Sequence, residues 1–398
     1  MIAIVYPQLY GVGGIARYLD SLLSNLLPRQ SPVILITGDR PAAARAYRSA
    51  EILHVPLASS RFELAVWSYR VRRLLQQLYD DGRVSLVNLH WPPLIPGLFL
   101  PKNLPLVLTA HTTYRGMSGE FYGQRYFPAQ WSPTSLRVKV QMERRILAHS
   151  SRVITLTEQG RQEIQSYGFA GPIDVVPNGT DIEKFIPDRS AAKDIDVLFS
   201  GRVELRKGSG AIAPLCKTLM SARPGIRICV VGYGDDEDQV LDELRCLEGN
   251  IEMAGKQPFD KMLDYYKRSR VYVSTSYYEG LPGTCLEAMA AGLPAVVWKF
   301  PFYRDLVVEG VTGHCVEPND LDAMSRKVLD LLSDETAASA MGAAARRLVE
   351  NRYDWKKLAS TVLDTLEGGC APRSEPIVSG HDFGQRPRSS TRRMQSPT

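Results

Sequence analysis

The fold of this chain is constrained most by a series of short, continuous apolar runs, rich in β-branched residues, with helical patterns between them. The first five runs lie at residues 2–6, 33–37, 85–90, 106–111 and 153–157. The series begins again after residue 185, with runs at 195–201, 226–232, 271–275 and 293–298. Continuous apolar runs that alternate with helices are typical of parallel strands covered on both faces. We therefore predict an α/β protein made of two facing, doubly wound, Rossmann-like domains.

The restart of the series divides the chain in two. We predict an N-terminal domain over residues 1–185 and a C-terminal domain over residues 186–370. A closing helix is expected over residues 353–367, where it could pack back on the first domain. Its apolar residues recur at helical spacing, at Trp355, Leu358, Val362 and Leu366. Residues 371–398 are rich in Pro, Ser, Gly and Arg, and we predict that they are disordered.

Composition argues against several classes of protein. The longest apolar runs fall far short of the ~20 residues that a transmembrane helix needs. The first residues lack the basic start and cleavage site of a signal peptide, so we expect a cytoplasmic protein. All six cysteines lie in the second half without metal-type spacing, and they are interpreted as reduced core thiols.

Charge is distributed unevenly along the chain. Residues 1–185 carry a net charge of +7 and residues 186–370 a net charge of −5. The basic half could face an anionic membrane, an anionic acceptor or nucleic acid, and a simply solvated face is an equal alternative. Residues 61–81 predict a helix with Arg70, Arg72 and Arg73 beside its apolar side. Such a helix can lie on a membrane, although core packing with exposed arginines is commoner.

A second basic and aromatic segment follows in the same half. Residues 123–145 form a long connection in our prediction, and their composition suits an acceptor site or the edge of a membrane.

A glycine-rich turn comes directly after the first predicted strand. Gly11, Gly13 and Gly14 precede an amphipathic helix, whose N-terminal N–H groups and partial positive charge suit an anion. A plain tight turn is the alternative. The full G-x-G-x-x-G spacing is missing, and the second strand ends in TGD without a persuasive ribose-binding acid, which argues against a dinucleotide dehydrogenase.

Basic residues follow the strand at 195–201. Arg202 and Lys207 stand in one glycine-bounded loop, where a guanidinium and an ammonium together suit a diphosphate; a solvated loop is the alternative. The acidic run from Asp235 to Asp238 is interpreted as structural, because acids favour a helix N-terminus. A metal-binding pair is the other possibility there.

Two glutamates stand in an apolar neighbourhood near residue 280. The segment reads YYEGLPGTCLEAMAAGLP, with Glu279 and Glu287 separated by seven residues. Gly280, Pro282 and Gly283 disfavour a helix that continues through Glu279, so we expect Glu279 in a loop and Glu287 on the helix that follows.

Together these segments resemble a known family. The sequence is similar to family 4 of the retaining, nucleotide-sugar-dependent glycosyltransferases, which have the GT-B fold. The motifs that carry the resemblance are GVGGIARYL, LTAHTT, VVPNGTDIEKF, GRVELRKG, VVGYGD, EGLPGTCLEAMAAGLP and EGVTGHCVEPND, in this order over nearly the whole chain. The resemblance implies a nucleotide-sugar site in the cleft between the two domains.

The resemblance also implies roles for individual residues. Glu287 would accept hydrogen bonds from the ribose hydroxyls, and Glu279 would contact the donor sugar. His111 matches a family active-site histidine, with a purely structural histidine as the alternative. The implied catalytic residues are Glu279, His111, Arg202 and Lys207. The implied donor-binding residues are Gly13, Gly14, Arg202, Lys207, Glu279, Gly280, Leu281, Gly283, Thr284 and Glu287.

The implied reaction is transfer of a hexosyl unit with retention of configuration. The donor would be a UDP- or GDP-sugar, and the acceptor a saccharide or lipid-linked saccharide of the cell envelope or an exopolysaccharide. We expect no cofactor, no metal and no nucleic-acid partner, and we leave peripheral contact with the inner membrane surface open. Pro282 stands where many members have glycine, which removes one backbone N–H and bears on sugar identity. The alternatives are a nucleotide-sugar epimerase of GT-B architecture and a non-catalytic basic binding protein.

Overall fold

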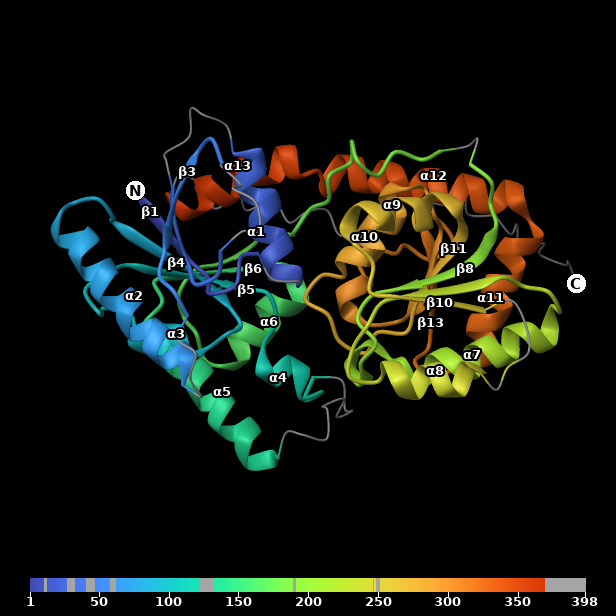
Figure 1. Cartoon of the computed structure of the whole chain (residues 1–398), viewed down its shortest axis with the longest axis horizontal. Coiled ribbons are helices and arrows are strands. Elements are labelled where there is room, and N and C mark those ends of the chain that lie inside the picture. Colours follow the sequence, from blue (N-terminus) through green and yellow to red (C-terminus); the bar gives the residue numbers. More distant parts are fainter. Residues whose placement is uncertain are drawn as a thin grey trace, which may run out of the picture.

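The computed structural model has two parallel sheets, each flanked by helices and lying next to the other (Figure 1). It describes residues 1–10, 13–26, 33–40, 47–57, 62–121, 132–188, 191–245, 247 and 251–368. The first sheet contains strands from residues 2–175, and the second contains strands from residues 195–316. The α/β fold with two Rossmann-like sheets is therefore confirmed.

The first sheet has seven strands in the order β3-β2-β1-β4-β5-β6-β7, and every pairing is parallel. Its strands are β1 (Ile2–Val5), β2 (Val33–Thr37), β3 (Ala50–His54), β4 (Leu86–Trp91), β5 (Leu106–Ala110), β6 (Arg152–Thr155) and β7 (Ile173–Val175). Its helices are α1 (Gly14–Asn25), α2 (Glu63–Asp80), α3 (Ile95–Phe99), α4 (Tyr114–Met117), α5 (Pro133–Leu147) and α6 (Glu158–Ser166). The central strand β1 is buried along its whole length, as its unbroken apolar sequence predicts.

The second sheet has six parallel strands in the order β10-β9-β8-β11-β12-β13. Its strands are β8 (Ile195–Ser200), β9 (Ile228–Val231), β10 (Ile251–Gly255), β11 (Ser269–Ser274), β12 (Ala295–Trp298) and β13 (Gly313–Val316). Its helices are α7 (Ser209–Ala222), α8 (Glu237–Arg245), α9 (Phe259–Arg268), α10 (Gly283–Ala290), α11 (Leu321–Ser333) and α12 (Glu335–Arg352). This is the doubly wound order, in which ligands bind outside the carboxyl ends of the strands.

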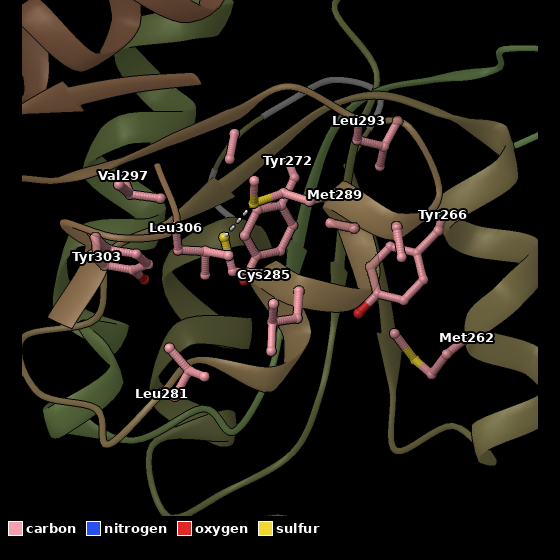
Figure 2. Packing of buried hydrophobic residues seen from close by; sticks show 14 of the residues in the cluster. Met262, Tyr266, Tyr272, Leu281, Cys285, Met289, Leu293, Val297, Tyr303 and Leu306 are labelled. Atoms are coloured by element: carbon pink, nitrogen blue, oxygen red, sulfur yellow. Dashed lines mark hydrogen bonds between the residues drawn. The ribbon is translucent and has the colours of Figure 1, made fainter. Parts of the chain in front are cut away.

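Helix α10 is enclosed by the core of the second half. Figure 2 shows Cys285 and Met289 of this helix beside the ring of Tyr272, with their sulfur atoms 3.9 Å apart. Cys285, Leu286, Ala288, Met289 and Ala290 are all buried. Dense packing around so short a helix fixes its position, and with it the position of the Glu287 carboxylate. The described cysteines, at 216, 229, 285 and 315, are free thiols, as expected.

The closing helix crosses back over the first half of the molecule. Helix α13 (Trp355–Leu366) lies beside α1, whereas α12 before it packs on the second half (Figure 1). The rings of Tyr18 and Trp355 meet edge to face, with their centroids 4.9 Å apart. The crossing is anchored where the Thr180 N–H donates to the Tyr353 carbonyl over 2.8 Å.

Two basic segments of the first half are helices on its surface. Helix α2 buries Trp67 and Leu75, while its arginines at 70, 72 and 73 are exposed. Residues 133–147 form α5, so the expectation of an irregular connection was wrong there. The reason is local, since the Ser132 hydroxyl caps the helix by accepting from the Ser135 N–H over 3.2 Å. Residues 122–131 and the predicted disordered tail at 371–398 lie outside the described residues. Among the described helices, none is both long and apolar enough to cross a membrane.

Candidate active site

The carboxyl ends of the two sheets meet at one close contact. A Cβ atom on Gly280 would lie 1.8 Å from the carbonyl oxygen of His111, so only glycine permits this approach. Gly280 belongs to the loop after β11, and His111 follows β5 of the other sheet. The contact brings the loop before α10 against the end of the first sheet, where a small cavity of about 10 Å³ remains.

Glu279 is a buried carboxylate with a cationic partner. It forms an ion pair with Lys207 and accepts a hydrogen bond from the Ser276 hydroxyl over 3.0 Å. Burial lowers the pKa of Lys207, and the Glu279 carboxylate opposes that shift. Gly208 has a φ of 75° and passes so close to the Thr275 carbonyl that a Cβ would lie 1.9 Å from it. This glycine therefore lets the loop that carries Arg202 and Lys207, here called the basic loop, pack against the end of β11.

Glu287 projects from α10, and both of its carboxylate oxygens are engaged. Oε1 forms an ion pair with Arg17 of α1, across the cleft, and Oε2 accepts from the Tyr266 hydroxyl over 2.9 Å. Burial and the Glu287 carboxylate raise the pKa of Tyr266, which keeps its hydroxyl protonated as a donor. On the same helix, the Thr284 hydroxyl is 2.9 Å from the Tyr272 hydroxyl.

The basic loop contains one more arginine than the sequence analysis singled out. Arg202 is about half exposed and pairs with Glu204 over 2.9 Å. Arg206 also pairs with Glu204, over 2.6 Å, and donates to the Tyr278 carbonyl over 3.1 Å. Burial would raise the pKa of Glu204, but Arg206, Arg202 and Lys207 together lower it below its usual value. Arg206 thus links the basic loop to the residue before Glu279, a role that its sequence position beside Lys207 did not indicate.

His111 is paired with a second histidine that the sequence analysis missed. The Nε2 atom of His111 lies 3.0 Å from Nδ1 of His90 at the end of β4. Burial lowers the pKa of His111 to about 3 and lowers the pKa of His90 well below its usual value. Both rings are therefore neutral near pH 7.

A buried polar network supports the cleft from the side of the first sheet. The Glu163 Oε2 atom accepts from the Thr113 hydroxyl over 2.6 Å and from the Tyr278 hydroxyl over 2.8 Å. Tyr278 immediately precedes Glu279, so this contact ties the loop after β11 to α6. Nearby, burial raises the pKa of Glu143 to about 8, while its Oε1 atom accepts from the Tyr114 N–H over 2.7 Å.

The remaining predicted donor-binding residues lie around two helix N-termini. Gly13 directly precedes α1, Gly14 begins it, and a Cβ atom on either would meet no described atom within 4 Å. Gly283 begins α10, and the nearest described atom to a Cβ there is Nδ2 of Asn178 at 3.9 Å. Leu281 is buried beside this start. Two N-termini with open space beside them are suited to anionic or hydroxyl-bearing ligands.

Both halves of the chain match families of sugar-transferring enzymes. Residues 12–184 match the family described as Glycosyltransferase Family 4, and residues 181–348 match Glycosyl transferases group 1. The chain belongs to the family 4 glycosyltransferases. Its resemblance to that family is thereby confirmed, and so is its character as a glycosyltransferase.

Individual relatives of this glycosyltransferase are distant. Glycogen synthase of Mycobacterium tuberculosis is 24% identical over 392 residues, which cover 90% of this chain and 92% of that protein. Sucrose-phosphate synthase of Thermosynechococcus elongatus has a similar structure, with a TM-score of 0.78, 19% identity, and coverage of 93% and 99%. HepE of Anabaena, in complex with UDP-glucose, gives a TM-score of 0.70 at 17% identity, with coverage of 92% and 99%. These likenesses to solved structures establish the GT-B fold.

Proposed function

We propose that this protein is a retaining, metal-independent hexosyltransferase. It takes the sugar from a UDP- or GDP-sugar and transfers it to a hydroxyl of a saccharide or lipid-linked saccharide in cell-envelope or exopolysaccharide synthesis. The observation that carries the proposal is the pair of buried carboxylates, Glu279 and Glu287, at the end of the second sheet and facing the first. Buried carboxylates need charged or hydrogen-bonding partners, and the cations that hold these two, Lys207 and Arg17, come from both halves of the chain, which makes this cleft the best candidate for the site.

The groups around these carboxylates suit the parts of a nucleotide sugar. Glu287 can accept hydrogen bonds from two vicinal ribose hydroxyls, since a carboxylate has two acceptor oxygens. Lys207, Arg202 and the N-terminus of α1 would stabilise the charge of the diphosphate. Glu279 would then accept from a hydroxyl of the donor sugar, with Lys207 holding its orientation.

The chemical step needs little from the protein beyond this electrostatic arrangement. The bond between the anomeric carbon and the diphosphate oxygen breaks, and its electron pair leaves with the diphosphate. The acceptor hydroxyl forms a new bond on the same face and gives its proton to the departing phosphate oxygen. Cationic groups fixed before the reaction stabilise the leaving charge without reorganisation. This route accounts for retention without a protein nucleophile.

The acceptor side belongs to the first half of the chain in this proposal. Phe62, which directly precedes α2, is 71% exposed, and Tyr69, Arg70 and Arg73 within the helix are exposed as well. Aromatic and basic groups side by side suit a lipid-linked acceptor at an anionic membrane surface. The names of the relatives support a saccharide acceptor and a UDP-sugar donor, as in glycogen synthase and in HepE bound to UDP-glucose.

The first experiment is donor binding by calorimetry with UDP, GDP, ADP and their common sugars, each with and without EDTA, beside NAD. We expect selective, EDTA-insensitive binding of one nucleotide sugar, with loss of binding in Glu287→Ala. Binding of NAD alone, or of no nucleotide, would overturn the proposal. Conversion of the free donor without any acceptor would favour the epimerase, and salt-sensitive binding to nucleic acid without a nucleotide effect would favour the binding protein.

A further inference from the structure

The two histidines at the ends of β4 and β5 form a pair that the proposed reaction does not yet use. His90 is fully buried and His111 is 8% exposed. One hydrogen bond joins Nδ1 of His90 to Nε2 of His111 over 3.0 Å. Because burial keeps both rings neutral, each ring carries a single N–H, and the shared contact needs one donor and one acceptor. Only two arrangements of the protons satisfy it.

The surroundings of His90 distinguish these arrangements. Its other nitrogen, Nε2, is buried and has no hydrogen-bond partner among the described residues. If His111 donated to His90, the proton of His90 would be at Nε2 as a buried donor without an acceptor. If His90 donates, Nε2 has only an unused lone pair. Buried N–H groups without a partner are rarer in folded proteins than acceptors with an unused lone pair, so the second arrangement is favoured.

We propose that His90 is a positioning residue that holds His111 in the Nδ1–H tautomer, so that this N–H donates to a hydroxyl of the donor sugar. The proposal rests on the proposed function, because it assigns a sugar to the cleft. His111 lines the cavity together with Glu279 and Gly280. Its Nδ1 atom makes no hydrogen bond to any residue that the structure describes, so this group is available to a ligand.

Packing also restrains the ring of His111 from turning over. The Tyr18 ring meets it edge to face, with centroids 4.8 Å apart and planes at 89°. Tyr18 is held in turn by Trp355 of α13, and it also packs 5.4 Å from the ring of His90. A ring flip would put the Cε1 carbon of His111 in the place of Nε2 and so break the contact with His90. Helices α1 and α13 therefore preserve the orientation that the tautomer requires.

The tautomer can be measured directly in the wild-type protein. The chain has six histidines, so ¹⁵N-histidine labelling with NMR detection of the ring nitrogens gives a spectrum that single substitutions can assign. We expect His111 to be protonated at Nδ1. His90→Asn should preserve this state, because the Asn side-chain nitrogen can occupy the place of Nδ1. His90→Leu removes the donor and should shift His111 towards the Nε2–H form.

Activity separates positioning from simple stabilisation. With the nucleotide sugar that binds in the calorimetry, His90→Leu should lower kcat/KM for transfer by about 2- to 10-fold, the range expected for one lost hydrogen bond between neutral groups. The affinity for the free nucleoside diphosphate should not change, because His111 would act on the sugar alone. His90→Asn should restore most of the rate, and His149→Asn, at an exposed histidine, should match wild type in both assays.

The outcomes distinguish this inference from the proposed function. A wild-type spectrum with His111 protonated at Nε2 would overturn the inference, even if the enzyme transfers sugar. An unchanged tautomer and rate in His90→Leu would overturn it as well. The expected tautomer in a protein that binds no nucleotide sugar would instead refute the proposed function and leave the assignment of the tautomer standing.

Discussion

At the scale of single residues, the Glu287 carboxylate gives the sharpest test of the donor site. Glu287→Gln keeps the shape but removes the charge that pairs with Arg17 and that would accept from the ribose. Hydrogen bonds to charged groups contribute about 1.5–3 kcal/mol, so we expect the affinity for the nucleotide sugar to fall about 10- to 100-fold. Calorimetry measures the effect, and Glu317→Gln, at an exposed ion pair with Lys299, is the control. Equal affinities in wild type and Glu287→Gln would remove Glu287 from the site.

Glu143 makes a prediction about stability and pH. Burial raises its pKa in the folded protein from the ordinary value of 4.5 to about 8. The folded state therefore holds a proton between these values that the unfolded state releases, so stability from this group is fully present below about pH 4.5 and is lost as pH rises towards 8. Glu143→Gln cannot titrate. The melting temperature of the variant, relative to that of wild type, should therefore rise between pH 5 and pH 8. Parallel curves of melting temperature against pH for the two proteins would contradict the prediction.

Residues that the sequence identified and those it missed differ in a physical way. His111, Lys207 and Glu279 lie in loops after strands, and Glu287 lies on the helix after one such loop, so the topology of a parallel sheet brings them to one cleft. Their partners depend on contacts between segments far apart in the chain, and no local pattern records such contacts. Arg17 meets Glu287 across 270 positions, and His90 lies one residue before the end of a strand that continues to Trp91. The roles assigned to the predicted residues stay predictions.

At the scale of elements, sequence patterns predicted the inner strands and missed the outer ones. The four strands that no apolar run indicated are β3, β7, β10 and β13, and they are the two edges of each sheet. Edge strands are covered less completely, and these four are largely intermediate in exposure, whereas β1, β2 and β5 are buried throughout. A strand that is partly exposed does not need a continuous apolar sequence, so periodicity alone could not reveal it.

The loop between β11 and α10 gives a prediction at the same scale. Gly280→Ala places a methyl group 1.8 Å from the His111 carbonyl, so the loop must withdraw from the first sheet. With the nucleotide sugar that binds in the calorimetry, we expect the rate of transfer to fall by at least tenfold. We also expect the free energy of unfolding to fall by about 1–3 kcal/mol because of overpacking. Gly210→Ala in α7 is the control, because a Cβ there meets no described atom within 4 Å and alanine favours a helix. Wild-type transfer by Gly280→Ala would show that the close approach is not needed.

At the scale of the whole molecule, two side-chain contacts join the halves across the cleft, and the first of them involves a carboxylate that the donor would use. Arg17 of α1 engages Glu287 of α10, and Tyr278 of the second half engages Glu163 of α6. The contact with Arg17 occupies the Glu287 carboxylate that the ribose would need. The contact between Tyr278 and Glu163 lies beside that carboxylate. If Glu287 binds the ribose as proposed, a nucleotide sugar would displace Arg17, and the approach of the two halves would be coupled to occupancy of the donor site.

Arg17→Ala tests separately the competition of Arg17 with the donor for Glu287 and the contact that Arg17 makes between the two halves. Without the cation, Glu287 can accept from the ribose with no ion pair to break, so the affinity for the nucleoside diphosphate should rise. The Arg17 side chain is 44% exposed, and exposed pairs contribute about 0.2–1 kcal/mol, so the gain in affinity should be at most about fivefold. In the absence of nucleotide, the radius of gyration from small-angle scattering should increase, since one contact between the halves is lost. Arg83→Ala, at an exposed pair within the first half, should change neither measurement.

Added salt should weaken the ion pair between Arg17 and Glu287 in wild type, because partly exposed charges are screened. It should therefore reduce the difference in affinity between wild type and Arg17→Ala. A fall in affinity on losing Arg17 would instead mean that the guanidinium binds the diphosphate itself, and the coupling described here would be wrong.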